Sequence, residues 1–393
     1  MHDFAEEIYF RFRNEQFVML MKSIDPTSRY VRLGVWVAVL WVVAAMPDIV
    51  QTSFGNRADN SISFSPSWLK AIRDLVTLAV FISVSNESVR SFYIFRIVAL
   101  FVAALYSVTA IARGISIDIA IRGVDWIPVL VWSATMSEDR VEDSKELIRG
   151  LFKILIPASL LVSLFLGFFG TGMYFESVLG YQRNPGLFLT PSATAFVSCL
   201  SFIFFRTAGT KLKALALISG ALTLSGVFYI NAMMLFGKLP RYFYWIITVL
   251  AVFIFGFFGL ENVIKIIASI AGGVRSDTAI SLTLLTRFDI IFEAISKFMF
   301  FGNYPVGLNV AANQNLDSFY PDNAVLAAVY AFGVIGILGV CWIVWMSRNN
   351  KVVGGTILLL IASFFYVWFE NMLFAGLVGF LINRNYISLD EKK

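Results

Sequence analysis

Five arginines in the segments between predicted membrane helices have the chemistry to bind an anionic ligand. A guanidinium group stays charged at physiological pH and binds two phosphate oxygens at once. Basic residues concentrate in cytoplasmic loops, so arginines on the outer face call for another role. The sequence predicts a pyrophosphate ligand, with contact to lipid headgroups or loop acids as the alternative for single members and the preferred one for Arg57. The five are Arg57, Arg113, Arg183, Arg275 and Arg287.

The chain lacks the residues on which several other chemistries depend. His2 is the single histidine, which argues against a catalytic histidine and a histidine-ligated metal site. The sequence has no glycine-rich phosphate loop, no zinc-ligand spacing, and neither an HExxH nor a GxSxG motif. ATP-driven transport and metallohydrolase chemistry therefore lack their usual residues, and no metal ion or cofactor is expected.

The composition is that of a membrane protein. Of the 393 residues, 58% are hydrophobic and 15% are charged, far from the values of a soluble domain. Apolar runs of about 18 or more residues recur, which predicts an all-α, polytopic integral membrane protein. The net charge of +5 mainly reflects residues that fix orientation and does not argue for nucleic acid. Cys199 and Cys341 lie in apolar runs and are expected to be small buried residues.

Basic residues orient the predicted spans, because cytoplasmic loops are enriched in lysine and arginine. The N-terminal arm, residues 1–32, has mixed charge, and its arginines and lysine predict that it lies in the cytoplasm. The spans then alternate in direction, and residues 170–186 form an outer loop that contains Arg183. The predicted spans of this part are Leu33–Val50, Trp68–Val84, Phe92–Ile111, Ile115–Met136, Leu147–Gly170 and Leu187–Phe205.

The apolar segment Ala214–Gly237 decides the topology of the second half. Basic residues flank both of its ends, so we interpret it as a hairpin bent near Ser225, with one straight helix as the alternative. The hairpin gives about twelve spans, both termini inside, and one large extracytoplasmic loop at residues 261–320. Membrane helices then occupy residues 33–260, and residues 321–393 form C-terminal membrane helices and a short cytoplasmic tail. With a straight helix, the large loop would be cytoplasmic.

Charged residues inside predicted spans need partners, because an unpaired charge in a membrane is costly. Arg122 lies one helical turn from both Asp118 and Asp125, so a structural ion pair is preferred over a substrate cavity. Lys70 and Arg73 are expected to extend from the outer end of their span toward the interface.

Within the large loop, Ile280–Phe301 is predicted to be an amphipathic helix. Apolar residues recur on one side, and Asp289, Glu293 and Lys297 follow one another at four-residue steps on another. Such a helix would lie in the membrane interface or cover the helix bundle.

The second half resembles the bacterial O-antigen polymerase and ligase superfamily. The similarity extends from Arg183 to Phe369, whereas the first half is similar in hydropathy only. In that family an arginine-containing helix leads into a turn rich in proline and glycine, and a span opens on His-Asn or Asp-Asn and continues as Phe-Gly-Ile-Ile-Gly. The corresponding segments are Thr286–Ile291, Phe301–Leu308, Asp322–Leu326, Ala331–Gly336 and the outer loop Arg183–Phe188 followed by Pro191 and Ser192.

The resemblance implies a polymerase of surface polysaccharide in the bacterial inner membrane. Such an enzyme transfers a growing glycan from undecaprenyl pyrophosphate onto an incoming lipid-linked repeat unit at the periplasmic face. The expected partners are this donor and acceptor, membrane lipids and a chain-length regulator protein. Ligases of the superfamily carry a histidine in the large loop, where this chain has Asp322, and this departure favours the polymerase.

The implied reaction assigns roles to residues of the predicted outer loops. Arginines that neutralise the leaving pyrophosphate would supply much of the catalysis without a metal. Asp322 is the preferred base for the acceptor hydroxyl, with Asp289 and Glu293 as alternatives that can equally be paired surface charges. The predicted catalytic residues are Asp322, Arg287 and Arg183, and the predicted substrate-binding residues are Arg275, Arg113, Asp289, Tyr181, Tyr304, Tyr320 and Asn323.

Two rival functions stay open on the sequence. A ligase would share the fold and the arginines but would move finished glycan to a different acceptor. A transporter of lipid-linked sugar should show internal repeats and charges spread over several spans, and the sequence shows no repeat and one clear intramembrane triad.

Overall fold

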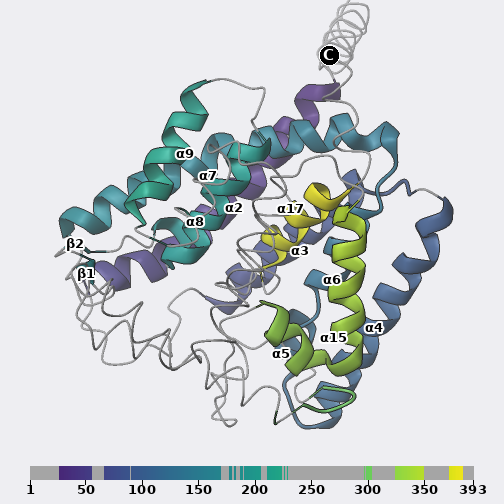
Figure 1. The fold of residues 1–393 in the computed structure, drawn as a ribbon. Coiled ribbons are helices and arrows are strands. Elements are labelled where there is room, and N and C mark those ends of the chain that lie inside the picture. The colour runs from purple at the N-terminus through teal and green to yellow at the C-terminus, as the bar shows by residue number, and fades with distance from the viewer. Residues whose placement is uncertain are drawn as a thin grey trace, which may run out of the picture.

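The computed structural model describes residues 26–54, 66–88, 90–169, 177–178, 181–182, 186–188, 190–204, 210–223, 225, 228, 296, 298–302, 324–348 and 371–383. These residues form an all-α assembly of packed helices with one two-residue hairpin (Figure 1). Within the described part of the chain, four helices are long and apolar enough to cross a membrane, namely Arg29–Val50, Tyr93–Ala112, Glu138–Leu166 and Ala324–Ser347. They indicate a multi-pass membrane protein. The predicted count of about twelve spans extends into segments outside the described residues.

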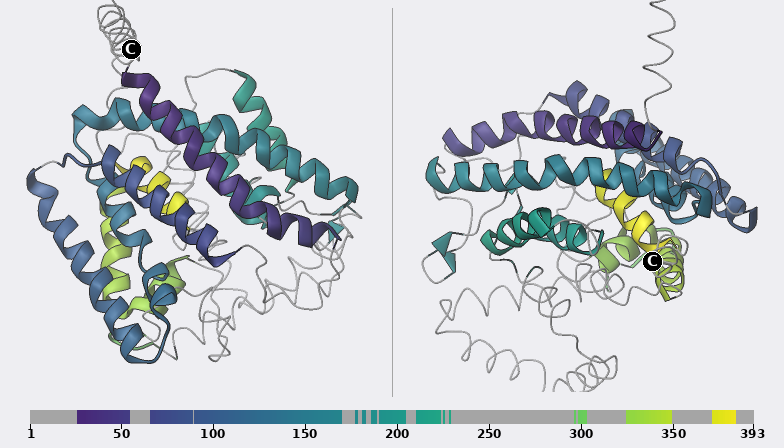
Figure 2. Two further views of the ribbon diagram at one scale, coloured as in Figure 1. Left: turned by 180° about the vertical axis from the view of Figure 1, so that it is seen from behind. Right: turned by 90° about the horizontal axis from the view of Figure 1, so that it is seen from above.

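The two longest helices lie side by side because small residues let their backbones meet. Helix α2 (Pro26–Phe54) follows α7 (Val141–Phe169) along much of its length, as both views of Figure 2 show. A Cβ atom on Gly34 would overlap with the carbonyl oxygen of Leu147, and one on Gly150 with that of Val31. Close packing through glycines is the usual means of association between apolar helices. Both helices begin before the predicted spans, α2 at Pro26 and α7 at Val141.

One predicted span is interrupted in the structure. Helices α3 (Ser67–Val84) and α4 (Tyr93–Ala112, after the turn η1 at Arg90–Phe92) match the predicted spans closely. The prediction of a single helix over Ile115–Met136 is wrong, because the chain forms α5 (Ile117–Arg122) and α6 (Trp126–Ala134). Pro128 gives the reason, since it cannot donate to the fourth preceding residue and is tolerated only in a first helical turn.

The chain after α7 enters the bundle before its next helix begins. Strands β1 (Ser177–Val178) and β2 (Tyr181–Gln182) form an antiparallel hairpin, and the turn η3 (Gly186–Phe188) follows. Helix α8 begins only at Pro191 and runs to Phe204, so the predicted span Leu187–Phe205 starts too early.

The predicted bend near Ser225 is present. Helix α9 (Thr210–Leu222) ends before it, and the amide of Phe228 donates to the carbonyl of Ser225 at 3.0 Å. The ring of Phe228 lies directly against Gly220, where a Cβ atom would overlap with it. A straight helix would hold these two residues about 12 Å apart along its axis. Helix α9 is therefore interrupted here, and Phe228 packs back against it.

A sharp bend also divides α15 (Ala324–Arg348), as Figure 1 shows. Gly333 has a φ of 57° and a ψ of −131°, a conformation that favours glycine. The amide of Val334 donates to the carbonyl of Phe300 at 3.0 Å, so the segment 298–302 packs against the bend. This segment is a turn, and the prediction of a helix reaching Phe301 is wrong at that end.

Polar contacts join the termini of several helices at one end of the bundle. The buried guanidinium of Arg96, at the start of α4, donates to the carbonyl of Ser85 at 2.6 Å, to that of Asn86 at 2.8 Å and to Thr135 Oγ1 at 3.0 Å. Asn383, which ends α17 (Met372–Ile382), donates to the carbonyls at the end of α6. Hence α2, α4 and α7 start at the end of the bundle where α3, α6 and α17 finish. This agrees with the predicted alternation in direction of successive spans.

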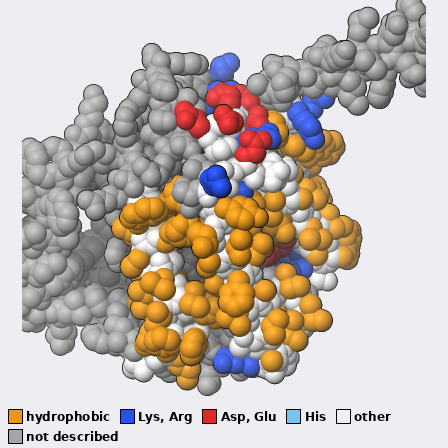
Figure 3. Space-filling model, turned by 90° about the vertical axis from the view of Figure 1, so that its right-hand side faces the viewer, with side chains coloured by type: hydrophobic (Ala, Val, Ile, Leu, Met, Phe, Trp, Pro, Cys, Tyr) orange, Lys and Arg blue, Asp and Glu red, His pale blue; other side chains and the backbone are white. Residues whose placement is uncertain are grey.

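Arg140 of the turn η2 (Glu138–Arg140) adds the start of α2 to this end, through Tyr30 and Glu87. We call this the Arg96 end of the bundle. Figure 3 shows a broad hydrophobic surface with acidic and basic side chains at its upper end and basic ones at its lower end, as expected of helices that contact lipid. Cys199 is buried, as predicted, whereas Cys341 is exposed on α15, contrary to the prediction.

Candidate functional site

Most of the predicted site residues lie outside the described part of the chain. Arg113 is described, and it follows α4 as an exposed residue at the end opposite Arg96. Tyr181 is described by its backbone alone, which pairs with Val178 in the hairpin. The remaining predicted residues, Asp322, Arg287, Arg183, Arg275, Asp289, Tyr304, Tyr320 and Asn323, lie outside the described residues.

Six charged residues from four helical segments gather at the same end as Arg113, and we call them the charge cluster. Asp48 comes from the last turns of α2, and Lys70, Arg73 and Asp74 from the first turns of α3. Arg122 ends α5, and Asp125 immediately precedes α6. The six residues contribute three cations and three carboxylates.

Ion pairs and hydrogen bonds connect the members of the charge cluster. Lys70 Nζ lies 3.7 Å from Asp48 Oδ2, which joins α3 to α2. Arg73 places Nη2 at 2.7 Å and Nε at 2.8 Å from Asp74 Oδ1. Arg122 Nη2 donates to the carbonyl of Ser67 at 3.0 Å, and its charge acts on both Lys70 and Asp125. Partly buried charges that are paired in this way avoid the cost of isolated ions.

Arg73 is held from two directions. Its guanidinium carbon lies 3.9 Å from the centre of the Trp41 ring, within the range of a cation–π interaction. Trp41 Nε1 in turn donates to Thr77 Oγ1 at 3.0 Å, and this hydroxyl donates to the Arg73 carbonyl at 2.7 Å. The arginine is thus oriented by a ring whose own position is fixed by a hydrogen bond.

The structure corrects two predictions about these charges. Lys70 and Arg73 do not extend away to the interface, because their side chains are only 21% and 19% exposed and bond within the bundle. Arg122 and Asp125 do not lie on one continuous helix, since α5 and α6 are separate, and Arg122 donates to the start of α3. The side chain of Asp118 lies outside the described residues.

One sequence signal pointed to the charge cluster. Arg73 and Asp74 are neighbouring charges in a largely apolar span. Arg122 and Asp125 lie three positions apart in another such span. Which helices bring these pairs together depends on tertiary packing, and the sequence contains no spacing that reports it.

The loop that carries Arg183, predicted to lie on the outer face, is anchored beside the charge cluster. Three residues after Arg183, the turn η3 buries Leu187, whose amide donates to Ser159 Oγ at 3.4 Å. Phe188 places its ring 6.5 Å from that of Trp41 and 4.9 Å from that of Phe374. Trp41 therefore contacts Arg73 on one hand and the end of the Arg183 loop on the other.

Gly186 makes this entry of the chain possible. Its φ is +60°, and a Cβ atom at this position would crowd Ser159 and Thr194. A side chain here would be strained by the backbone and would also meet its neighbours. The loop is thereby fixed at its second end by the packing of α2, α7 and α8.

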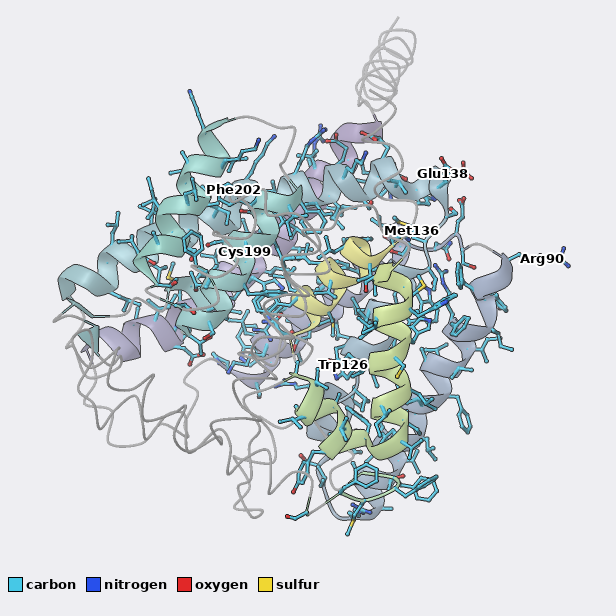
Figure 4. The ribbon with its side chains drawn as sticks, viewed as in Figure 1. Arg90, Trp126, Met136, Glu138, Cys199 and Phe202 are labelled. Atoms are coloured by element: carbon cyan, nitrogen blue, oxygen red, sulfur yellow. The ribbon has the colours of Figure 1, made fainter. Side chains whose placement is uncertain are left out.

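The geometry suits the recognition of an anion at the membrane surface. Three cations lie close together, and exchanging an internal carboxylate partner for a phosphate would conserve their ion pairs. Among the described residues, the carboxylates do not come together with other ligands as a metal site. Arg90 lies outside the charge cluster and projects away from the bundle in Figure 4. Trp126 lies at the junction of α6 with the bent α15.

Comparisons of the chain with protein-family models, with curated proteins and with solved structures found no match. The resemblance to the O-antigen polymerase and ligase superfamily therefore rests on the segments quoted from the sequence.

Proposed function

We propose that this protein is a glycosyltransferase of the bacterial inner membrane that polymerises undecaprenyl-pyrophosphate-linked repeat units at the periplasmic face. The observation that carries the proposal is the shared position of Trp41. This ring contacts Arg73 of the charge cluster and lies beside Phe188, three residues beyond the end of the Arg183–Pro185 segment. An arginine loop that the resemblance assigns to the site is thus tied to a cluster of further cations.

In the proposed reaction, the bond between the sugar anomeric carbon and the pyrophosphate oxygen breaks. The hydroxyl oxygen of the acceptor sugar forms the new bond to that carbon, and its proton passes to a carboxylate, for which Asp322 is the candidate. The pyrophosphate takes the electrons of the broken bond and leaves while still attached to its lipid carrier. Arg183 and Arg287 are the candidates that stabilise its charge, because fixed cations act where charge develops in the transition state.

The charge cluster is the candidate for a second anion contact beside these arginines. It carries as many carboxylates as cations, so a phosphate would bind there by taking the place of Asp48 beside Lys70 or of Asp74 beside Arg73. Arg113, at the same end of the bundle, is a further candidate for binding the donor.

The test is polymerisation by the purified protein with a lipid-linked repeat unit as the single substrate. The wild type is expected to give a ladder of products, and Arg287→Ala and Asp322→Asn are expected to abolish it. Arg90→Ala removes an exposed cation at the opposite end of the bundle and serves as the matched control. Normal polymerisation by both variants would refute the assignment of the site, and no ladder from the wild type would refute the proposed function.

A further inference from the structure

Four consecutive large apolar side chains are exposed on the turn 298–302, which packs against the bend of α15. Phe298, Met299, Phe300 and Phe301 are between 41% and 73% exposed, whereas Gly302 is buried. The rings of Phe300 and Phe301 pack edge to face with centres 5.0 Å apart, so they form one apolar surface. The sequence predicts that these residues belong to a large extracytoplasmic loop, yet a contiguous apolar surface of this kind marks a contact with protein or membrane.

The backbone of the turn is fixed against α15, so its side chains stay on the outside. Gly302 has a φ of +85°, and a Cβ atom on it would overlap with the carbonyl oxygen of Ala331. A Cβ atom on Gly333 would overlap in the same way with the carbonyl oxygens of Met299 and Phe300. The two segments therefore meet backbone to backbone through glycines, and no side chain separates them.

Three consecutive carbonyls of the turn each have a hydrogen-bond donor within the protein. The carbonyl of Met299 accepts from the amide at the end of the turn at 3.0 Å, and that of Phe300 accepts from an amide of α15 at 3.0 Å. The carbonyl oxygen of Phe301 lies 3.1 Å from the hydroxyl of Tyr106, which is shared with the carbonyl of Phe332 at 2.9 Å. Irregular backbone is tolerated at membrane depth where the protein satisfies its polar groups, because lipid supplies no donors. These three carbonyls meet that requirement.

Tyr106 fixes the depth of the turn. It lies on α4, which is long and apolar enough to cross a membrane, six residues before the last residue of that helix, Ala112. At about 1.5 Å per residue, Tyr106 is about 9 Å from this end of the span. The 20 residues of α4 match the thickness of the hydrocarbon core, about 30 Å. The attachment point of the turn is therefore inside the span.

Apolar side chains of α4 are exposed at the same level. Leu105 and Val108 flank Tyr106 in sequence and are 45% and 65% exposed. Because they belong to a helix with the length and hydropathy of a membrane span, lipid surrounds the bundle at this level. The apolar faces of segments that lie in a membrane interface are buried about 5–10 Å, which agrees with the depth of Tyr106.

We propose that the turn 298–302 is embedded in the lipid layer, with its phenylalanine rings among the acyl chains close to the headgroups. The partner of this surface is the bilayer itself, and the proposal does not depend on the proposed function. This part of the predicted extracytoplasmic loop then returns into the membrane. It gives the loop one fixed point, at the end of the bundle that also carries Arg113 and the charge cluster.

The test measures the depth of nitroxide labels on single cysteines of the protein in vesicles of phosphatidylethanolamine and phosphatidylglycerol. Cys199 and Cys341 are first replaced by alanine. The collision rate of each label with oxygen, which concentrates in lipid, is divided by its collision rate with a water-soluble nickel chelate. Phe300→Cys and Met299→Cys each place a label on the turn, and because both native side chains are exposed, neither label displaces a buried group.

Two reference sites in α4 and just beyond it calibrate the measurement. Ser116→Cys is exposed in the short connection after α4 and reports water, whereas Phe101→Cys is exposed in the middle of α4 and reports lipid. Both labels on the turn are expected to give a ratio about tenfold above that of Ser116→Cys and no higher than that of Phe101→Cys, as at an interfacial depth.

Two results would overturn the proposal. A ratio equal to that of Ser116→Cys would place the turn in water. Low collision rates with both reagents would show that protein covers the turn, either another part of this chain or a second copy. Gel filtration identifies a variant that does not fold, and the second label on the turn then decides the result.

Discussion

Replacing Arg96 by methionine is expected to destabilise the Arg96 end of the bundle strongly. The side chain is 4% exposed, and its two shortest hydrogen bonds, to Ser85 and Asn86, measure 2.6 and 2.8 Å. A hydrogen bond to a charged group contributes about 1.5–3 kcal/mol, so these two correspond to about 3–6 kcal/mol. The lower end is expected, because Asn86 is exposed and its carbonyl can regain water.

The assay is thermal unfolding of the purified protein in detergent, followed by tryptophan fluorescence. A domain of 150–250 residues shifts by about 2–4 °C per kcal/mol and a longer chain by less, so a fall in Tm of about 5 °C or more is expected. Arg90→Met is the control, since Arg90 is an exposed arginine that projects away from the bundle (Figure 4). A Tm for Arg96→Met within 1 °C, roughly the experimental scatter, of this control would refute the reasoning.

Three further predictions concern packing and topology. Tyr106→Phe removes the hydroxyl that holds the bend of α15 and should cost about 1–3 kcal/mol, seen as a lower Tm than that of the exposed control Tyr93→Phe; equal values would contradict it. Gly34→Ala should abolish recovery of folded monomer in gel filtration, because its Cβ atom would overlap with α7; a normal yield would count against the α2–α7 contact. With the native cysteines replaced, Ser116→Cys should react with a membrane-impermeant maleimide in intact cells and Asn86→Cys only after lysis; the reverse pattern would invert the topology.

Hydropathy predicted helices best where one continuous apolar run forms one helix. The bounds of α3 and α4 agree with their predictions within two residues. The segment Ile115–Met136 failed because hydropathy does not detect the backbone effect of Pro128 in its middle. The bend at Ser225 was predicted correctly because basic residues flank both ends of its segment, and hydropathy alone does not register such residues.

Fewer of the predicted site residues than of the predicted helices lie in the described part of the chain. Its arginine loops are defined by local motifs, and of its residues the structure describes only Arg113 fully. The charge cluster was not predicted as such, because the sequence singled out Arg73 and Arg122 only as members of two separate groups and gave no role to Asp48. The stacking of Arg73 on Trp41 has no sequence signal at all, since 32 positions separate the two residues.

The sequence alone determined that this chain is a helical membrane protein, because lipid requires each spanning segment to satisfy its own backbone hydrogen bonds and therefore leaves a hydropathy signal. Tertiary structure alone decided which charges meet, where η3 enters the bundle beside Trp41, and that the turn 298–302 packs against the bend at Gly333. These features depend on contacts between helices distant in sequence. Membrane-embedded helices are all similarly apolar, so hydropathy does not identify their neighbours, and only the packing of particular small, aromatic and charged side chains selects them.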